Sequence, residues 1–139
     1  MAVLLLASTP SNLLASRQTI FHYEPETSTL FGVIQTMEHF GPPNYGENPE
    51  TDQREVAYIL LLDQSIRVEP TPGHIDASGI DTDTFNNVSR VQLAAPAELT
   101  VSSFIGKHVA VTGKLYERFS GHHITDVLIM ADKVDLLQR

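Results

Sequence analysis

Hydrophobic and polar residues alternate along much of this chain, and the alternation is clearest between residues 107 and 117. There Val109, Val111 and Leu115 share one parity, which is the period of a β-strand with a single buried face. Gly113 stands between them, and a glycine inside a strand usually marks a β-bulge or a sharp bend. This segment therefore predicts a bent strand of the kind that closes a small barrel.

The same alternation predicts further strands and a fold built almost wholly from them. The segment that ends at Asp63 is apolar on both faces near its middle, so we expect it at the centre of the sheet. Residues 96–104 have room for one short helix or turn before a closing hairpin. The fold class is therefore all-β with at most one short helix, as a small OB-like Greek-key β-barrel, and a β-sandwich is the alternative. The expected strands occupy residues 30–38, 55–63, 66–69, 88–94, 107–117 and 123–134.

The first sixteen residues differ from the rest, because they carry no charge and include the apolar run from Val3 to Ala7. Such a run followed by small residues is typical of the end of a signal peptide, with a plain helix or a disordered N-terminus as alternatives. We therefore expect one OB-like domain at residues 17–139, outside this segment, and a periplasmic or secreted protein. No run of about 18 apolar residues, which a transmembrane helix would need, occurs in the sequence.

The charge balance lowers the expectation of nucleic-acid binding. The chain has 17 acidic and 9 basic residues, a formal net charge of −8, and no basic stripe. Affinity for nucleic acids comes largely from Lys and Arg that neutralise phosphates, so an acidic chain is a poor candidate. The absence of cysteine also excludes disulfides, thiolate nucleophiles and cysteine-based zinc sites.

Four segments carry a resemblance to a known family. They read GPPNY at residues 41–45, YILLLD at 58–63, GKHVAVTGKL at 106–115 and GHHITDVL at 121–128. With these segments the chain resembles a family of bacterial proteins of unknown function that is usually found behind signal peptides. Family members tend to have Thr before the Gly-His-His and Pro before the Val-Leu, where this chain has Ser120 and Asp126. The resemblance implies an OB-like fold and a secreted or periplasmic setting, and it implies no particular activity.

Gly121, His122 and His123 stand at the turn of the last predicted hairpin. Neighbouring residues on a strand point to opposite faces, so the two imidazoles are poorly placed to bind one metal ion together. One interpretation makes the exposed ring a partner-binding group, or a metal ligand together with His108 from the neighbouring strand. The interpretation that we favour is a structural one, in which a ring hydrogen-bonds to the backbone of the turn. We expect neither a bound metal nor a cofactor.

Aromatic residues near the same turn suggest a ligand-facing surface. OB folds that hold single strands or sugars stack the ligand on aromatic side chains. Tyr116 and Phe119 flank the turn, and we expect Tyr45, from the Gly-Pro-Pro segment, to join them. The candidate ligand- or partner-binding residues are Tyr45, Tyr116, Phe119, His122 and His123.

No catalytic residues are expected. Ser120, His122 and Asp126 supply the residue types of a hydrolase triad, but their spacing does not place a base beside a nucleophile on a rigid elbow. Residues 81–87 alternate oxygen-bearing side chains as a calcium loop does, yet Phe85 occupies one of the ligand positions. We interpret that segment as a solvated loop.

These observations lead to three hypotheses about function. The first is a non-enzymatic binding module of the bacterial envelope that recognises a protein, such as an inhibitor or immunity partner of a toxic enzyme. The second is a carbohydrate or oligonucleotide binder that uses the OB face, and of these two ligands the glycan is favoured by the acidic charge. The third is a metal-dependent enzyme that uses the histidine hairpin.

Overall fold

The computed structural model describes residues 18–74 and 79–138. Strands and one 3₁₀ helix make up its regular structure, which confirms the all-β fold class with a single short helix. The helix, η2, falls within the segment where the sequence left room for one. The elements are β1 (Thr19–His22), β2 (Ser28–Phe40), β3 (Arg54–Glu69), β4 (Phe85–Ala94), η2 (Val101–Phe104), β5 (His108–Glu117) and β6 (Val127–Leu136).

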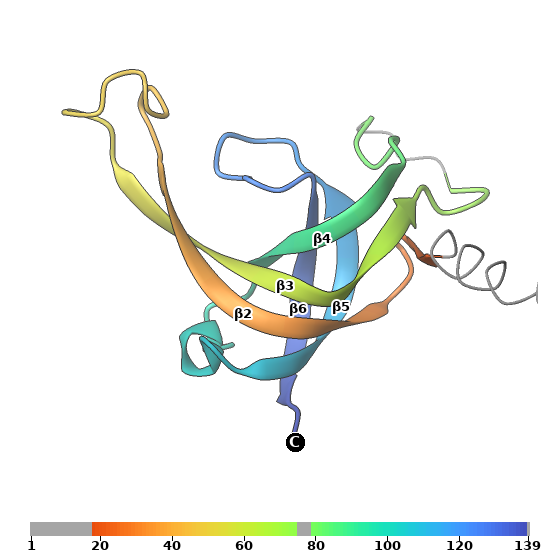
Figure 1. Cartoon of the computed structure of the whole chain (residues 1–139). Helices are drawn as coiled ribbons and strands as arrows, with labels where there is room; N and C mark the ends of the chain where they lie inside the picture. Colours follow the sequence, from red (N-terminus) through yellow and green to blue (C-terminus); the bar gives the residue numbers. More distant parts are fainter. Residues whose placement is uncertain (1–17, 75–78, 139) are drawn as a thin grey trace, which may run out of the picture.

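Five of the strands close into a barrel (Figure 1). The sheet runs β1-β3-β2-β5-β6-β4. An additional pairing of β4 with β3 closes the ring β3-β2-β5-β6-β4 and leaves β1 outside it. Strand β1 pairs in parallel with β3, and β4 pairs in parallel with β6, whereas the other pairs are antiparallel. This order, with η2 between β4 and β5, is that of a small OB-like Greek-key barrel rather than a β-sandwich.

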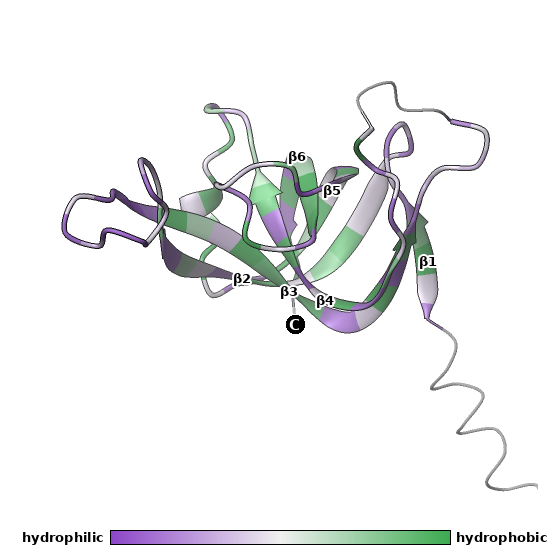
Figure 2. Ribbon diagram, turned by 90° about the horizontal axis from the view of Figure 1, so that it is seen from above, coloured by the Kyte–Doolittle hydropathy of each residue, from purple (hydrophilic) through white to green (hydrophobic). Residues whose placement is uncertain are grey.

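Strand β3 lies at the centre of the sheet, as its apolar sequence predicted. It pairs with β1, β2 and β4. The alternating residues Val109, Val111 and Leu115 of β5 are fully buried, so the predicted buried face is confirmed. Figure 2 shows the hydrophobic residues gathered on the strands, while the loops at the ends of the barrel are largely hydrophilic.

Two glycines allow the strands to coil tightly enough for closure. A Cβ atom on Gly113 would lie 2.0 Å from the carbonyl oxygen of Met130, and one on Gly32 would lie 2.1 Å from that of Leu61. The register between β5 and β6 shifts between Thr112 and Gly113, which is the β-bulge that the sequence predicted there. Any other residue would force the neighbouring strands apart at these positions.

Several predicted strand boundaries were wrong. Residues 55–63 and 66–69 belong to one strand, β3, because the chain bends at Gln64 and Ser65 without reversing, and its register with β4 shifts there. Residues 123–126 were predicted as strand but form part of a loop, since side chains rather than a neighbouring strand bind the backbone at Ile124. The short strand β1 was missed. The segment 1–16, expected to be a signal-peptide remnant, lies outside the described residues.

The described part of the chain contains no helix that is long and apolar enough to cross a membrane.

Candidate functional site

The five candidate residues lie on the β2–β3 loop (residues 41–53), at the end of β5 and on the β5–β6 loop (residues 118–126), where their rings form two groups. The rings of Tyr45 and His122 meet edge to face, with centroids 5.9 Å apart. Tyr45 lies over Gly121, where a Cβ atom would come within 2.6 Å of the tyrosine ring. Glycine is therefore needed for this contact. We call Tyr45, Tyr116, Phe119, His122 and His123 the aromatic patch.

The second half of the aromatic patch is a cluster of three rings beside β5. The centroid of His123 lies 4.6 Å from that of Phe119 and 5.8 Å from that of Tyr116, both edge to face. Tyr116 and Phe119 are 5.9 Å apart. Edge-to-face and tilted contacts of this kind stabilise aromatic clusters beyond simple burial. Even so, the ring of Phe119 stays mostly in solvent, since the residue is 60% exposed, and Tyr45 is 46% exposed.

The ring of His123 acts as a hydrogen-bond acceptor within the loop. Its Nδ1 accepts a hydrogen bond from the backbone N–H of Phe119 at 3.1 Å, so the proton of the neutral ring is on Nε2. Burial lowers the pKa of His123, and the nearby His122 and Arg118 lower it further. Desolvation and like charge both disfavour the imidazolium. This contact matches the expected structural histidine, whose ring bonds to the backbone of the turn.

The β5–β6 loop is fastened to the barrel by Gln92, which the sequence analysis did not identify as a site residue. The buried side chain of Gln92 donates from Nε2 to the carbonyl of His122 at 3.1 Å and accepts from the N–H of Ile124 at 2.7 Å. Its own N–H donates to Oγ1 of Thr125 at 2.9 Å. The available signal was a lone amide between the apolar Val91 and Leu93 in a buried strand.

The β2–β3 loop is held by Asp52, which was also missed. Its carboxylate accepts hydrogen bonds from the backbone N–H groups of Asn44 (2.7 Å), Gly46 (2.7 Å) and Asn48 (3.1 Å). Burial raises the pKa of Asp52, but these three hydrogen bonds outweigh it and leave the pKa below its usual value. They also hold Tyr45 in a left-handed conformation, with φ of 51°.

A carboxylate with two imidazoles joins the β5–β6 loop to strands β2 and β3. Nδ1 of His122 donates to Oε1 of Glu55 at 2.8 Å, and Nε2 of His39 lies 3.7 Å from the same oxygen. His39 and Glu55 are a cross-strand pair on β2 and β3. The carboxylate fits because Gly41 has no side chain, since a Cβ atom there would come within 2.6 Å of Glu55. The contact positions His122 against Tyr45.

Acidic residues border the aromatic patch. Burial raises the pKa of Tyr116, and the charge of Glu24 raises it further. The carboxylate of Glu117 accepts hydrogen bonds from the N–H groups of Thr82 and Asp83, both at 3.1 Å, and burial raises its pKa. This contact ties the start of the 81–87 segment to β5. The nearby Arg118 is itself paired with an acid, Asp126, at 3.7 Å.

The histidines proposed as metal ligands are not brought together. His108 begins β5, whereas His122 and His123 follow the other end of that strand, and Nε2 of His108 is paired with Asp63 at 2.7 Å. Among residues 18–74 and 79–138, no group of three or more His, Asp or Glu side chains is arranged to hold a metal ion.

The three residues of the considered triad also lack the required contacts. Oγ of Ser120 accepts a hydrogen bond from the backbone N–H of His122 at 3.2 Å, while the imidazole of His122 is bonded to Glu55. The carboxylate of Asp126 is paired with Arg118. The serine therefore has no base beside it in this arrangement. The groups that the site presents to a ligand are the faces and edges of aromatic rings and hydrogen-bonding groups, held on two anchored loops.

Comparison with known protein families finds a match to part of the chain. Residues 90–135 are similar to a family described as Domain of unknown function (DUF4431). No curated protein and no solved structure matched the chain. The matched segment contains Gln92 and the whole β5–β6 loop. The hydrogen bonds by which Gln92 holds this loop, here called the Gln92 clamp, therefore lie entirely within the part shared with the family. The resemblance to a family of unknown function is thus supported for this segment.

Proposed function

We propose that this protein is a non-enzymatic binding module of the bacterial envelope that recognises a protein partner through the aromatic patch. Such a partner would be a toxic enzyme that the module inhibits or against which it gives immunity. The observation that carries the proposal is the exposure of Phe119 and Tyr45 on two anchored loops. Exposed aromatic side chains at a preorganised position are typical anchors of protein interfaces, because they bury much area at little entropic cost.

The charge around the aromatic patch supports a partner with a basic surface. Glu24, Glu117 and Asp126 border the rings, and the one neighbouring cation among the contacts described above, Arg118, is paired. The whole chain carries a formal charge of −8. Complementary charge at the rim of an interface mainly raises the association rate, and salt weakens that effect. We therefore expect binding that slows as the salt concentration rises.

The test is affinity capture from a bacterial periplasmic extract with the full chain as bait. A Tyr45→Ser/Phe119→Ser variant removes the exposed rings, and Leu136→Ser, which changes an exposed hydrophobic residue at the end of β6 remote from the β5–β6 loop, is the matched control. We expect one protein at near-equal stoichiometry with the native chain and the control, and its loss with the double variant. Equal capture by all three baits, or no captured protein, would contradict the proposal.

A carbohydrate or oligonucleotide ligand is the second candidate, and the position of the aromatic patch favours it. The patch lies between the first and last hairpin loops of the barrel, which OB folds use to bind oligosaccharides and oligonucleotides. The acidic charge favours a glycan over a nucleic acid. Titration of the native chain with uncharged oligosaccharides and with a short single-stranded DNA shows which of the two ligands binds. The Tyr45→Ser/Phe119→Ser variant should lose this binding, because the ligand would stack on the exposed rings.

No observation favours the remaining alternative, a metal-dependent enzyme that uses the histidine hairpin. His122 is engaged with Glu55, and His123 with the backbone of Phe119.

A further inference from the structure

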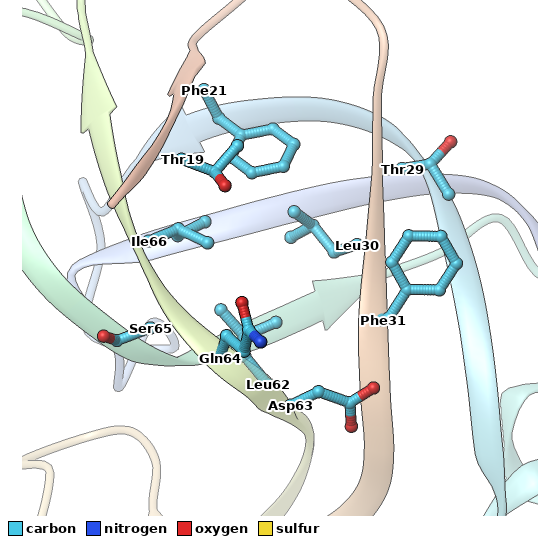
Figure 3. A pocket seen from close by; sticks show the side chains of 10 residues that line it. All are labelled: Thr19, Phe21, Thr29, Leu30, Phe31, Leu62, Asp63, Gln64, Ser65 and Ile66. Carbon is cyan, nitrogen blue, oxygen red and sulfur yellow. The ribbon is translucent and has the colours of Figure 1, made fainter. Parts of the chain in front are cut away.

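A hollow of about 350 Å³ lies on the barrel at the point where the strand paired with β3 changes from β2 to β1 (Figure 3). The pairing of β2 with β3 ends at Gly32 and Leu62, and the pairing of β1 with β3 begins at Thr19 and Ile66. Between these points β3 bends, and its register with β4 shifts. The gap between β2 and β3 is therefore a consequence of the bend, and side chains of β1, β2 and β3 surround it.

The inner part of the hollow is hydrophobic. Leu30 and Ile66, which are 2% and 6% exposed, reach toward its middle from β2 and β3 (Figure 3). Phe21 from β1 and Phe31 from β2 also line it, and Phe31 is 49% exposed. When an apolar ring covers a half-exposed phenylalanine beside buried aliphatic side chains, apolar surface is removed from water, which favours binding of the ring.

The rim of the hollow is polar and carries a carboxylate. Thr19, Thr29, Gln64 and Ser65 contribute hydroxyl and amide groups, and Asp63 contributes a negative charge. The Oδ2 atom of Asp63 accepts a hydrogen bond from His108 at 2.7 Å, while its side chain remains 46% exposed. An ionised carboxylate only accepts hydrogen bonds, so its second oxygen favours a donor, and most of all a cationic one.

We propose that this hollow is a second binding site, for a small organic cation that carries a hydrophobic ring. The ring lies on Leu30, Ile66 and Phe31, and the ammonium group binds Asp63. The volume falls within the range of small-molecule sites, which combine an apolar lining with a few polar groups that orient the ligand. The site is distinct from the aromatic patch, because none of the residues that line the hollow belongs to the patch.

The proposal is tested with three probes that share one ring and differ in charge: benzylamine, benzyl alcohol and benzoate. Each is titrated into the full chain while amide and methyl NMR signals are followed. Since the carboxylate is half exposed, we expect benzylamine to bind about threefold more tightly than benzyl alcohol. Benzoate should bind most weakly. The shifts should concentrate at Phe21, Leu30 and Ile66.

Matched variants separate the charge from the rest of the site. Asp63→Asn should abolish the preference for benzylamine, whereas Asp132→Asn, an exposed acid on β6, should keep it. Because Asp63→Asn also changes the partner of His108, His108→Gln is the second control, and it should keep the preference. The proposal is overturned if benzoate binds as well as benzylamine, if none of the probes shifts these signals, or if the shifts map to the aromatic patch instead.

Discussion

Gln92 Nε2 donates a hydrogen bond to the carbonyl oxygen of His122 at 3.1 Å, and this contact links β4 to the β5–β6 loop across 30 residues of sequence. The same side chain accepts the N–H of Ile124. One buried amide therefore satisfies both a donor and an acceptor of a loop that would otherwise have no strand partner. The orientation of His122 and His123 in the aromatic patch depends on this clamp.

Gln92→Leu should release the β5–β6 loop. The substitution keeps an apolar shape in β4 but leaves the His122 carbonyl and the Ile124 N–H without their partner. We expect the free energy of unfolding to fall by about 2 kcal/mol, the usual cost of unpaired buried polar groups. Denaturant unfolding measures this loss, and hydrogen exchange at Ile124 should become faster. Gln35→Leu on the exposed part of β2 is the control, and an equal loss there would refute the role of the clamp.

Asp52→Asn should disorder the β2–β3 loop around Tyr45, because an amide cannot accept from three N–H groups as a carboxylate does. The pKa of Asp52 is lowered in the folded state. The carboxylate therefore stabilises the fold at a pH above its ordinary pKa of 3.8, and this contribution is lost as the pH falls through the folded-state pKa. We expect the variant to melt at a lower temperature than the native protein at neutral pH and at the same temperature in strong acid. A difference that persists in acid would argue against the carboxylate as its cause.

His123 should make the aromatic patch sensitive to mild acid. Its folded-state pKa lies below the ordinary 6.5, so the unfolded chain binds the proton more readily. The neutral ring therefore makes its full contribution to stability above pH 6.5, and this contribution is lost as the pH falls through the folded-state pKa. Protonation also removes the acceptor of the Phe119 N–H.

An NMR titration of the His123 ring and the Phe119 amide measures this coupling directly. Both signals should move with one midpoint, below pH 6.5. His123→Asn should flatten the dependence of stability on pH between about pH 5 and 7. A midpoint above the ordinary value, or a Phe119 amide that does not follow the ring, would contradict the assignment.

Gly113→Ala should prevent β5 and β6 from closing normally. The added Cβ atom would lie 2.0 Å from the carbonyl oxygen of Met130, which is backbone and has little freedom to move. We expect a loss of about 3 kcal/mol or more, or failure to fold, because relief of the clash must break the pairing at the bulge. Denaturant unfolding provides the measurement. Lys114→Ala, one residue on and half-buried, is the control and should change stability far less.

Much of the aromatic patch was predictable because it is local in sequence. Tyr116, Phe119 and His123 lie within eight positions of one hairpin, so any hairpin at this place brings them near one another. Tyr45 was expected to join Tyr116 and Phe119, but its ring contact is with His122. The residues that anchor the loops were not predicted, because an amide in β4 or a carboxylate at the end of a polar loop has no distinctive local pattern.

The sequence by itself determined the β-strand character of the chain, its buried face at Val109, Val111 and Leu115, and the bulge at Gly113. These follow from the period of two and from the missing side chain of glycine, which act over a few neighbouring residues. Only the tertiary structure decided where strands end and which side chains hold the loops. Hydrogen bonds form between groups that are close in space, whatever their separation in sequence. Gln92 reaches the β5–β6 loop because β4 and β6 pair side by side in the fold, and the sequence alone does not show this pairing.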